Sequence, residues 1–204
     1  MKNNNILYLG SDSYFRKLLL TESLIPFIVV GHTADEESVD SALSLEQQVR
    51  YLAQLKMDHV AIPAGAIEGQ VCYVLTADSM VSNEKGEKYS KPTTTQEAYE
   101  KIRTMSGLQK VATGYCIEKR IWKNNHWMTD KHICDVSVTT FIFKVPESKI
   151  EAYFKNTNAM QSCGAIVSQG YGTQFMECFN GSYSGAVGLP LFEVRTILEE
   201  WGFF

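Results

Sequence analysis

Residues 71–77 constrain the fold of this chain more than any other segment. They read VCYVLTA, without a charge, and lead into Asp78-Ser79, where we expect the segment to end. Apolar, β-branched and aromatic residues on consecutive positions are typical of a strand that is buried on both faces. Because such a strand needs covering elements on either side, the segment predicts a layered α/β fold.

Helical and strand patterns alternate along the rest of the chain, which predicts a mixed, twisted sheet with flanking helices. Ser44 with Gln47, and Thr94 with Glu97, have the three-residue spacing of helix-capping pairs. Since no linker or repeat interrupts the pattern, residues 1–204 are expected to form a single domain. The predicted strands are 6–9, 24–30, 71–77, 112–121 and 135–145, with turns at 83–87 and 123–125. The predicted helices follow residue 13, cover 44–56 and 94–105, begin at residue 146 and cover 190–201, and 164–172 is expected to be a glycine-rich loop.

The charge balance excludes a protein dedicated to nucleic acid. There are 19 Lys and Arg against 23 Asp and Glu, a net charge of −4, whereas binding to a phosphate backbone needs a basic surface. A small polyanion is still compatible, because a few cations can converge in one cleft. The start of the chain lacks the apolar core of a signal peptide, and no apolar run is long enough for a bilayer. We therefore expect a cytoplasmic protein that binds neither nucleic acid nor a membrane.

The cysteines point to a reducing compartment. They are odd in number, widely scattered and without a CxxC pair, so neither a disulfide framework nor a zinc site is indicated. Buried, reduced thiols are the expected state. The five residues are Cys72, Cys116, Cys134, Cys163 and Cys178.

A loop suited to phosphate lies between the first predicted strand and helix. It reads Gly10-Ser11-Asp12-Ser13, and the N–H groups at a helix start attract anions. The hydroxyls of Ser11 and Ser13 add donors, and Arg16 in the first helical turn could hold a phosphate with two hydrogen bonds. The alternative is that Ser13 only caps the helix and Arg16 is solvated.

Asp78 and an acidic pair at Asp35-Glu36 are candidates for catalysis and metal binding. A carboxylate at the end of an apolar strand is expected at the carboxyl edge of the sheet, where α/β folds bind ligands. If the Asp35-Glu36 loop folds over Asp78, three carboxylates could share Mg²⁺ or Mn²⁺, which prefer oxygen ligands. The alternatives are a turn-capping Asp78 and a solvated surface pair.

Lys56, at the end of a predicted helix, and Lys91, in the extended stretch before Pro92, are further candidates for anion binding. The alternative for each, and the usual state of a lysine, is a solvated surface side chain. The four histidines show no HExxH or triad-like company, and no GxSxG elbow supports acyl transfer.

Taken in order, these segments resemble the Maf family of nucleotide pyrophosphatases over almost the whole chain. The likeness comprises that family's opening phosphate loop, its acidic loop, its Ala-Asp-Thr, Gly-Lys-Pro, Leu-Ser-Gly and Thr-Gly motifs, and its two late loops. Each short motif is unspecific, but their common order and spacing make the likeness specific. The matching segments are residues 9–17 (LGSDSYFRK), 34–36 (ADE), 56 (K), 76–79 (TADS), 90–92 (SKP), 105–107 (MSG), 113–114 (TG), 168–172 (SQGYG) and 183–190 (YSGAVGLP).

The resemblance implies two lobes around a nucleotide-binding cleft, and hydrolysis of the α–β phosphoanhydride of a nucleoside triphosphate to the monophosphate and pyrophosphate. Asp78 would be the general base or a metal ligand that orients water, and Glu36 would join it in binding Mg²⁺ or Mn²⁺. Arg16, Lys56 and Lys91 would clamp the triphosphate, and Gln169 would meet the base edge. The full set implied to contact the substrate is Ser11, Ser13, Phe15, Arg16, Lys56, Ser79, Lys91 and Gln169.

Departures from the family pattern bear on the substrate. The pyrimidine-directed branch carries two adjacent arginines where this chain has Phe15-Arg16, and an aromatic at this position resembles the branch that hydrolyses 7-methyl-GTP. A cationic methylated purine over the ring would gain cation–π attraction. Ser79 and Gln169 instead resemble the pyrimidine-directed branch. We favour 7-methyl-GTP slightly and keep dTTP or UTP as the alternative.

Two other classes of function stay open at this stage. One is a nucleotide-binding regulator of cell division with little catalysis, an association implied by the family and favoured by the missing arginine at Phe15. The other is an interaction protein whose charged residues are only solvated surface. The assembly state, monomer or homodimer, is also open.

Overall fold

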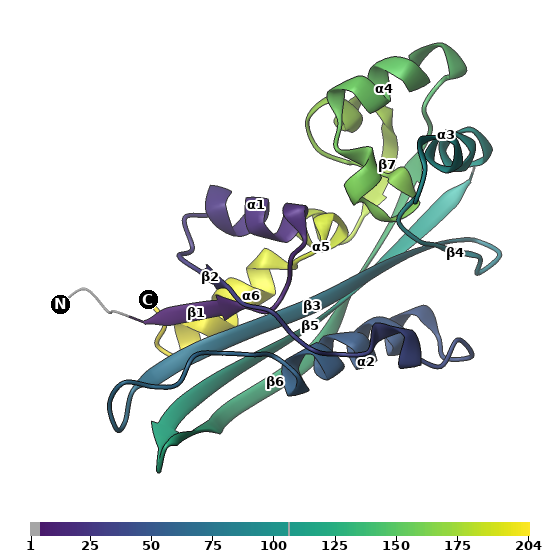
Figure 1. Ribbon diagram of the computed structural model, residues 1–204. Helices are drawn as coiled ribbons and strands as arrows, with labels where there is room; N and C mark the ends of the chain where they lie inside the picture. Colours follow the sequence, from purple (N-terminus) through teal and green to yellow (C-terminus); the bar gives the residue numbers. More distant parts are fainter. Residues whose placement is uncertain (1–4, 106) are drawn as a thin grey trace.

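The computed structural model describes residues 5–105 and 107–204, so that residues 1–4 and Ser106, part of the 105–107 motif, lie outside it. Its centre is a seven-stranded sheet in the order β2-β1-β3-β5-β6-β7, with β4 paired to β3 (Figure 1). β1 runs parallel to β2 and β3, and the other pairs are antiparallel, which confirms the predicted mixed sheet. The strands are β1 (Ile6–Leu9), β2 (Ile28–Val29), β3 (Val71–Asn83), β4 (Lys88–Tyr89), β5 (Leu108–Lys123), β6 (His126–Phe143) and β7 (Met176–Asn180).

Helices cover both faces of the sheet. α2 (Leu45–Asp58) lies on one face, whereas α1 (Tyr14–Glu22), α5 (Tyr183–Val187) and α6 (Leu191–Glu200) lie on the other (Figure 1). A second group gathers at the far end of the long strands (Figure 1). It contains α3 (Thr95–Thr104), α4 (Ile150–Asn156) and the short 3-10 helices η2 (Glu147–Lys149), η3 (Ala159–Gln161), η4 (Cys163–Ala165) and η5 (Gly170–Phe175).

Separate apolar clusters fasten these layers to the sheet. Leu20 of α1 and Leu198 of α6 pack with Leu75 of β3, all of them fully buried. On the opposite face Val49 of α2 packs against Ala112 of β5. Burying each large apolar side chain contributes about 1.5–3 kcal/mol, so these contacts hold the helices against the sheet.

β3 is longer than the sequence indicates, and Asp78 lies inside it instead of at its end. The prediction that the strand ends at Asp78-Ser79 is therefore wrong: pairing with β5 continues to Asn83. On its other edge, β1 leaves β3 after Leu75, and β4 joins it only at Val81. Residues 76–80 therefore form an edge without a strand neighbour. The strand that ends near Asp78 is therefore β1 and not β3. Asp78 lies in β3 just beyond the point where β1 ends.

Two expected segments differ from the structure. The strand predicted at 24–30 is reduced to β2, because Pro26 has no N–H for a ladder and Leu24 adopts φ 56° in full exposure. The glycine-rich stretch at 164–172 is not an open loop but contains parts of η4 and η5. β7 and α5, which follow it, have no clear periodicity in the sequence.

Local capping and turn chemistry is confirmed. Ser44 and Gln47 form a reciprocal capping box, with distances of 3.2 and 2.9 Å, and the Thr94 side chain accepts from the backbone N–H of Glu97. Asn124 and Asn125 both have positive φ, as a tight hairpin between β5 and β6 requires.

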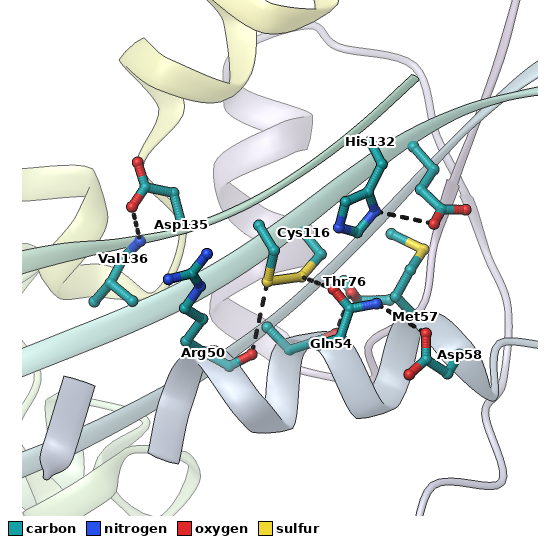
Figure 2. Close-up of a disulfide and its surroundings, with 12 residues drawn as sticks. Arg50, Gln54, Met57, Asp58, Thr76, Cys116, His132, Asp135 and Val136 are labelled. Carbon is teal, nitrogen blue, oxygen red and sulfur yellow. Dashed lines mark hydrogen bonds and ion pairs between the residues drawn. A yellow bond between two sulfur atoms is a disulfide. The ribbon is translucent and has the colours of Figure 1, made fainter. Parts of the chain in front are cut away.

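Cys116 and Cys134 form a disulfide, so the prediction that all thiols are reduced is wrong for this pair (Figure 2). The two residues face each other in the β5–β6 register, with their Cα atoms 4.1 Å apart. α2 covers the bond: the Sγ of Cys116 lies 3.6 Å from Gln54 Oε1 and that of Cys134 lies 3.6 Å from the Arg50 carbonyl oxygen. A spacing of 18 residues does not reveal this partnership, because it depends on strand register.

Among residues 5–105 and 107–204, the helices are too short or too polar to cross a bilayer.

Candidate active site

A cleft of about 910 Å³ opens beside the free edge of β3. One wall is the loop from β1 into α1, and the opposite wall contains Lys91 and residues 161–163. The cleft therefore runs between the α1 and α5 group and the group at the far end of the strands, which correspond to the two expected lobes. It also reaches round the strand edge to α2 and to η1 (Glu36–Ser38).

Strand geometry places Asp78 and Ser79 on opposite faces of the sheet. Thr76 faces α2, because its Oγ1 donates to the carbonyl of Ala53 at 2.7 Å. Alternate side chains of a strand share a face, so Asp78 also faces α2 and Ser79 faces α1 and α5. The site is therefore built from two centres that meet around one unpaired strand edge.

Lys56 organises the centre on the α2 face. Its Nζ lies 2.7 Å from Asp78 Oδ1 and 2.9 Å from Glu36 Oε2. Lys56 is 5% exposed, and α2 delivers its ammonium group to the strand edge from the last helical turn. His32 adds a longer contact, 3.7 Å from its Nε2 to Glu36 Oε1. This centre contains one lysine cation between two carboxylates.

Arg16 organises the centre on the other face, and its partners are neutral. Nε donates to the carbonyl of Gly188 at 2.8 Å, Nη1 to Ser11 Oγ at 2.8 Å and Nη2 to Ser79 Oγ at 3.0 Å. A guanidinium has five N–H donors, so two have no hydrogen-bond partner among the residues that the structure describes. Burial lowers the pKa of Arg16 from its ordinary value, and the negative charge of Asp78 opposes that shift. Arginine remains a cation at neutral pH.

The Gly10–Ser13 loop approaches β3 closely. A Cβ on Gly10 would lie 2.9 Å from Thr76 Cγ2, so only glycine fits there without displacement. Ser13 occupies the N-cap position of α1, but its side chain makes no capping bond. The backbone N–H of Ser13 instead donates to Ser11 Oγ at 3.3 Å, and the loop presents both serines to the cleft.

Lys91 is exposed and lines the cleft. The preceding residue is held in place, because the carbonyl of Ser90 accepts from Gly164 N and from Lys101 Nζ, both at 3.0 Å. Lys91 therefore extends from an anchored segment, with its ammonium group free to reach an anion in the cleft.

Gln169 and Phe15 meet at a smaller cavity of about 30 Å³ that continues from the cleft. The two spaces share walls, among them Phe15, Cys163 and Val187, but Gln169 lines only the smaller one. Phe15 is 7% exposed and belongs to the apolar cluster behind the cleft. Its ring is therefore mainly a packing element rather than an open face for a cation.

The expected group of three carboxylates does not form. Asp35 caps η1, with its Oδ1 accepting from the N–H of Glu37 at 3.2 Å. In the described part of the chain, no three His, Cys, Asp or Glu side chains gather as a metal site. Glu36 and Asp78 do converge, because both contact the same nitrogen of Lys56. Two carboxylates with room for phosphate oxygens fit a hard divalent cation.

Several residues of the site have no role that the sequence predicts. Thr113, buried under Ser79, bonds to it at 2.8 Å, and Cys163 donates its thiol to the Ser79 carbonyl at 3.4 Å. Burial raises the pKa of Cys163. Gly188 accepts from Arg16 and adopts φ 132°, a conformation that favours glycine. The 113–114 and 183–190 motifs of the family resemblance contain Thr113 and Gly188, but their roles require the structure.

An arginine on one face of a strand edge, and a lysine between two carboxylates on the other face, define an enzyme-like cleft for a polyanion. Residues 6–201 match the profile of the family described as Maf-like protein. The chain is 28% identical to a dTTP/UTP pyrophosphatase of Hydrogenovibrio crunogenus and 32% identical to one of Thermococcus kodakarensis, with 97% of each chain covered. It is 30% identical to a nucleoside triphosphate pyrophosphatase of a Synechococcus species, over 93% of this chain and 100% of that one. The chain belongs to the Maf-like protein family.

Proposed function

We propose that the protein hydrolyses the α–β phosphoanhydride of a nucleoside triphosphate, releasing the monophosphate and pyrophosphate. The observation that carries the proposal is the meeting of the Arg16 and Lys56 centres at the free edge of β3. The three relatives described above bear names for this activity, and they align with almost the whole chain.

Asp78 is the proposed general base. Lys56 holds one carboxylate oxygen, Oδ1, at 2.7 Å, so the other oxygen is left to accept a proton from the attacking water. The water oxygen forms a bond to the α-phosphorus, the α–β bridging bond breaks, and pyrophosphate leaves with the bonding electrons.

Glu36 and Asp78 are also the proposed ligands of Mg²⁺ or Mn²⁺. Such an ion would neutralise charge that builds on the phosphate oxygens. With such an ion bound, Asp78 would act as a ligand that orients the water, and Lys56, which contacts both acids, would share their negative charge with the ion.

Arg16, Lys91, Ser11 and Ser13 are the proposed phosphate contacts. Arg16 has two donors left after its three hydrogen bonds to the protein, and Lys91 lines the same cleft from an anchored segment. Hydrogen bonds to charged groups contribute about 1.5–3 kcal/mol each, which is enough to orient the leaving pyrophosphate.

For the base we propose thymine or uracil in preference to 7-methylguanine. The slight preference for 7-methyl-GTP comes from the aromatic residue at position 15, which resembles the 7-methyl-GTP branch and would attract a cationic base over its ring. That ring is buried in an apolar cluster. The dTTP/UTP names of two relatives agree with a pyrimidine. The amide of Gln169 offers both a donor and an acceptor, matching the N3–H and O4 of these bases. Since its cavity is about 30 Å³, the base must lie at the mouth or displace the cavity wall.

A substrate panel tests the proposal. Purified protein with Mg²⁺ or Mn²⁺ is incubated with dTTP, UTP, CTP, GTP and 7-methyl-GTP, and products are separated by ion-exchange chromatography. We expect monophosphate and pyrophosphate, with the highest kcat/KM for dTTP or UTP. Release of orthophosphate and a diphosphate would contradict the bond assigned. A highest value for 7-methyl-GTP would overturn the base preference alone, and tight binding without turnover would favour the nucleotide-binding regulator.

A further inference from the structure

Thr113 lies in the site without touching the cleft. It is fully buried in β5, opposite Ser79 in the β3–β5 register, and it lines neither the cleft nor the smaller cavity. The simplest role for a threonine at such a position is packing within the sheet. Its hydroxyl, however, is hydrogen-bonded on both sides, to Ser79 Oγ and to the carbonyl of Gly185, each at 2.8 Å.

The direction of each bond follows from the partners. A carbonyl can only accept, so the single hydroxyl hydrogen of Thr113 points to Gly185. Thr113 therefore accepts from Ser79, and the hydrogen of Ser79 points away from the cleft. Ser79 in turn accepts from Arg16 Nη2 at 3.0 Å. The result is a one-way chain of donors from Arg16 through Ser79 and Thr113 to Gly185.

This series of hydrogen bonds ends on α5, and the C-terminal end of the same helix also holds Arg16. Gly185 lies in α5 and Gly188 at its C-cap, where the carbonyl accepts from Arg16 Nε at 2.8 Å. Arg16 is thus fixed between α5 and β3, with Thr113 linking these two elements beneath it. Because each of these hydroxyls has one hydrogen, no alternative arrangement satisfies the Arg16, Ser79 and Gly185 contacts together.

We propose that Thr113 is a positioning residue that sets the orientation of the Arg16 guanidinium through Ser79. The inference rests on the proposed function only in assuming that Arg16 binds phosphate. It also changes the role assigned to Ser79. The sequence placed Ser79 among the substrate contacts, but its hydrogen is used by Thr113. Ser79 therefore orients Arg16 and does not donate to a phosphate.

The test compares Thr113→Val, Thr113→Ser and a matched control. Thr139 in β6 is also buried, and its Oγ1 donates to the carbonyl of Ser182 at 2.9 Å, just before α5. Thr139→Val therefore removes the same kind of bond near the same helix without touching the hydrogen bonds of Arg16.

We expect Thr113→Val to lower kcat/KM for the best triphosphate about tenfold, the equivalent of one lost bond. Thr113→Ser and Thr139→Val should stay within about twofold of the parent.

A double-mutant cycle shows whether Thr113 acts through Arg16. In an Arg16→Gln background, Thr113→Val should change kcat/KM by less than about twofold, because the oriented group is gone. An equal tenfold loss in both backgrounds would overturn the proposal, as would Thr113→Val activity within twofold of the parent. Thermal unfolding of each variant checks that the compared proteins are folded.

Binding of inorganic pyrophosphate separates this inference from the proposed function. If the unmodified protein hydrolyses no triphosphate, the proposed function fails, and calorimetry with pyrophosphate still tests the chain of bonds. A Kd about tenfold weaker in Thr113→Val, with no change in Thr139→Val, would support the positioning role. An equal Kd in the parent and Thr113→Val would overturn it.

Discussion

The two faces of β3 hold a cation in opposite ways. On the Ser79 face, Arg16 donates only to neutral oxygens, those of Ser11, Ser79 and Gly188. On the Asp78 face, Lys56 contacts two carboxylates within 2.9 Å. The first face keeps a positive charge for a ligand, whereas the second carries an excess of negative charge. We infer that one face suits phosphate oxygens and the other suits water and a metal ion.

The contrast also explains why one cation is an arginine and the other is a lysine. The planar fork of arginine can reach three neutral acceptors and still present donors to a ligand, which a lysine ammonium cannot do. A compact ammonium suits Lys56, since it enters between two acids from a helix end. The predictions below test this division, in order of decreasing effect.

Removal of the Asp78 charge should have the largest effect. Asp78→Asn keeps the shape of the side chain but loses the proposed base, and general-base catalysis contributes about 10²–10⁴-fold. We expect kcat to fall by that factor while the Kd for pyrophosphate changes much less, because the three hydrogen bonds that hold Arg16 are unchanged. Asp135→Asn on β6, whose Oδ1 accepts from the adjacent Val136 N–H, is the strand control. An Asp78→Asn protein with more than a tenth of the parent kcat would contradict the role.

A change under α2 should weaken the packing of this helix on the sheet. Gly114 follows Thr113 in β5, and a Cβ there would lie 2.2 Å from the Val49 carbonyl of α2. Gly114→Ala must push the helix outward, and overpacking of this kind costs about 1–3 kcal/mol of unfolding free energy. Chemical denaturation should show that loss. Gly31→Ala, with no atom near the added carbon, is the control. Equal stability of the two variants would show that α2 is not held by close contact.

Loss of the lysine cation should strengthen metal binding. Lys56→Gln removes the positive charge between Glu36 and Asp78, so we expect the affinity for Mn²⁺ to rise about tenfold, measured by calorimetry without nucleotide. Lys110→Gln, which removes a cation 2.8 Å from Glu46 outside the cleft, should leave it unchanged. Weaker Mn²⁺ binding in Lys56→Gln would mean that the two acids need Lys56 to converge.

Features governed by neighbouring residues could be predicted from the sequence. The capping pair Ser44 and Gln47 and the turn at Asn124-Asn125 depend on contacts over a few residues, and both form. Asp78, Lys56 and Lys91 could be assigned to one cleft through an ordered set of motifs, although each was ambiguous alone.

Features governed by strand pairing could not be predicted. The Cys116–Cys134 bond depends on which residues of β5 and β6 face each other. Asp78 was placed at a strand end because the sequence does not show that β3 continues past the end of β1. A buried hydroxyl such as Thr113 resembles any strand threonine until its partners are known.

The alternation of Asp78 and Ser79 makes the alignment of β3 with β5 a determinant of activity. The ladder between them extends from Val71 opposite Ile121 to Asn83 opposite Gln109. A slip of one residue would turn every side chain to the other face. A slip in one direction would bring Ser79 to Lys56 but Met80 to Arg16. A slip in the other direction would bring Ala77 to Lys56 and would place the acid of Asp78 beside Arg16, where it cancels the positive charge. The same amino acids in a shifted register would form a sheet without the Arg16 centre or the Lys56 centre. Correct pairing of β3 with β5 during folding is therefore itself a requirement for catalysis.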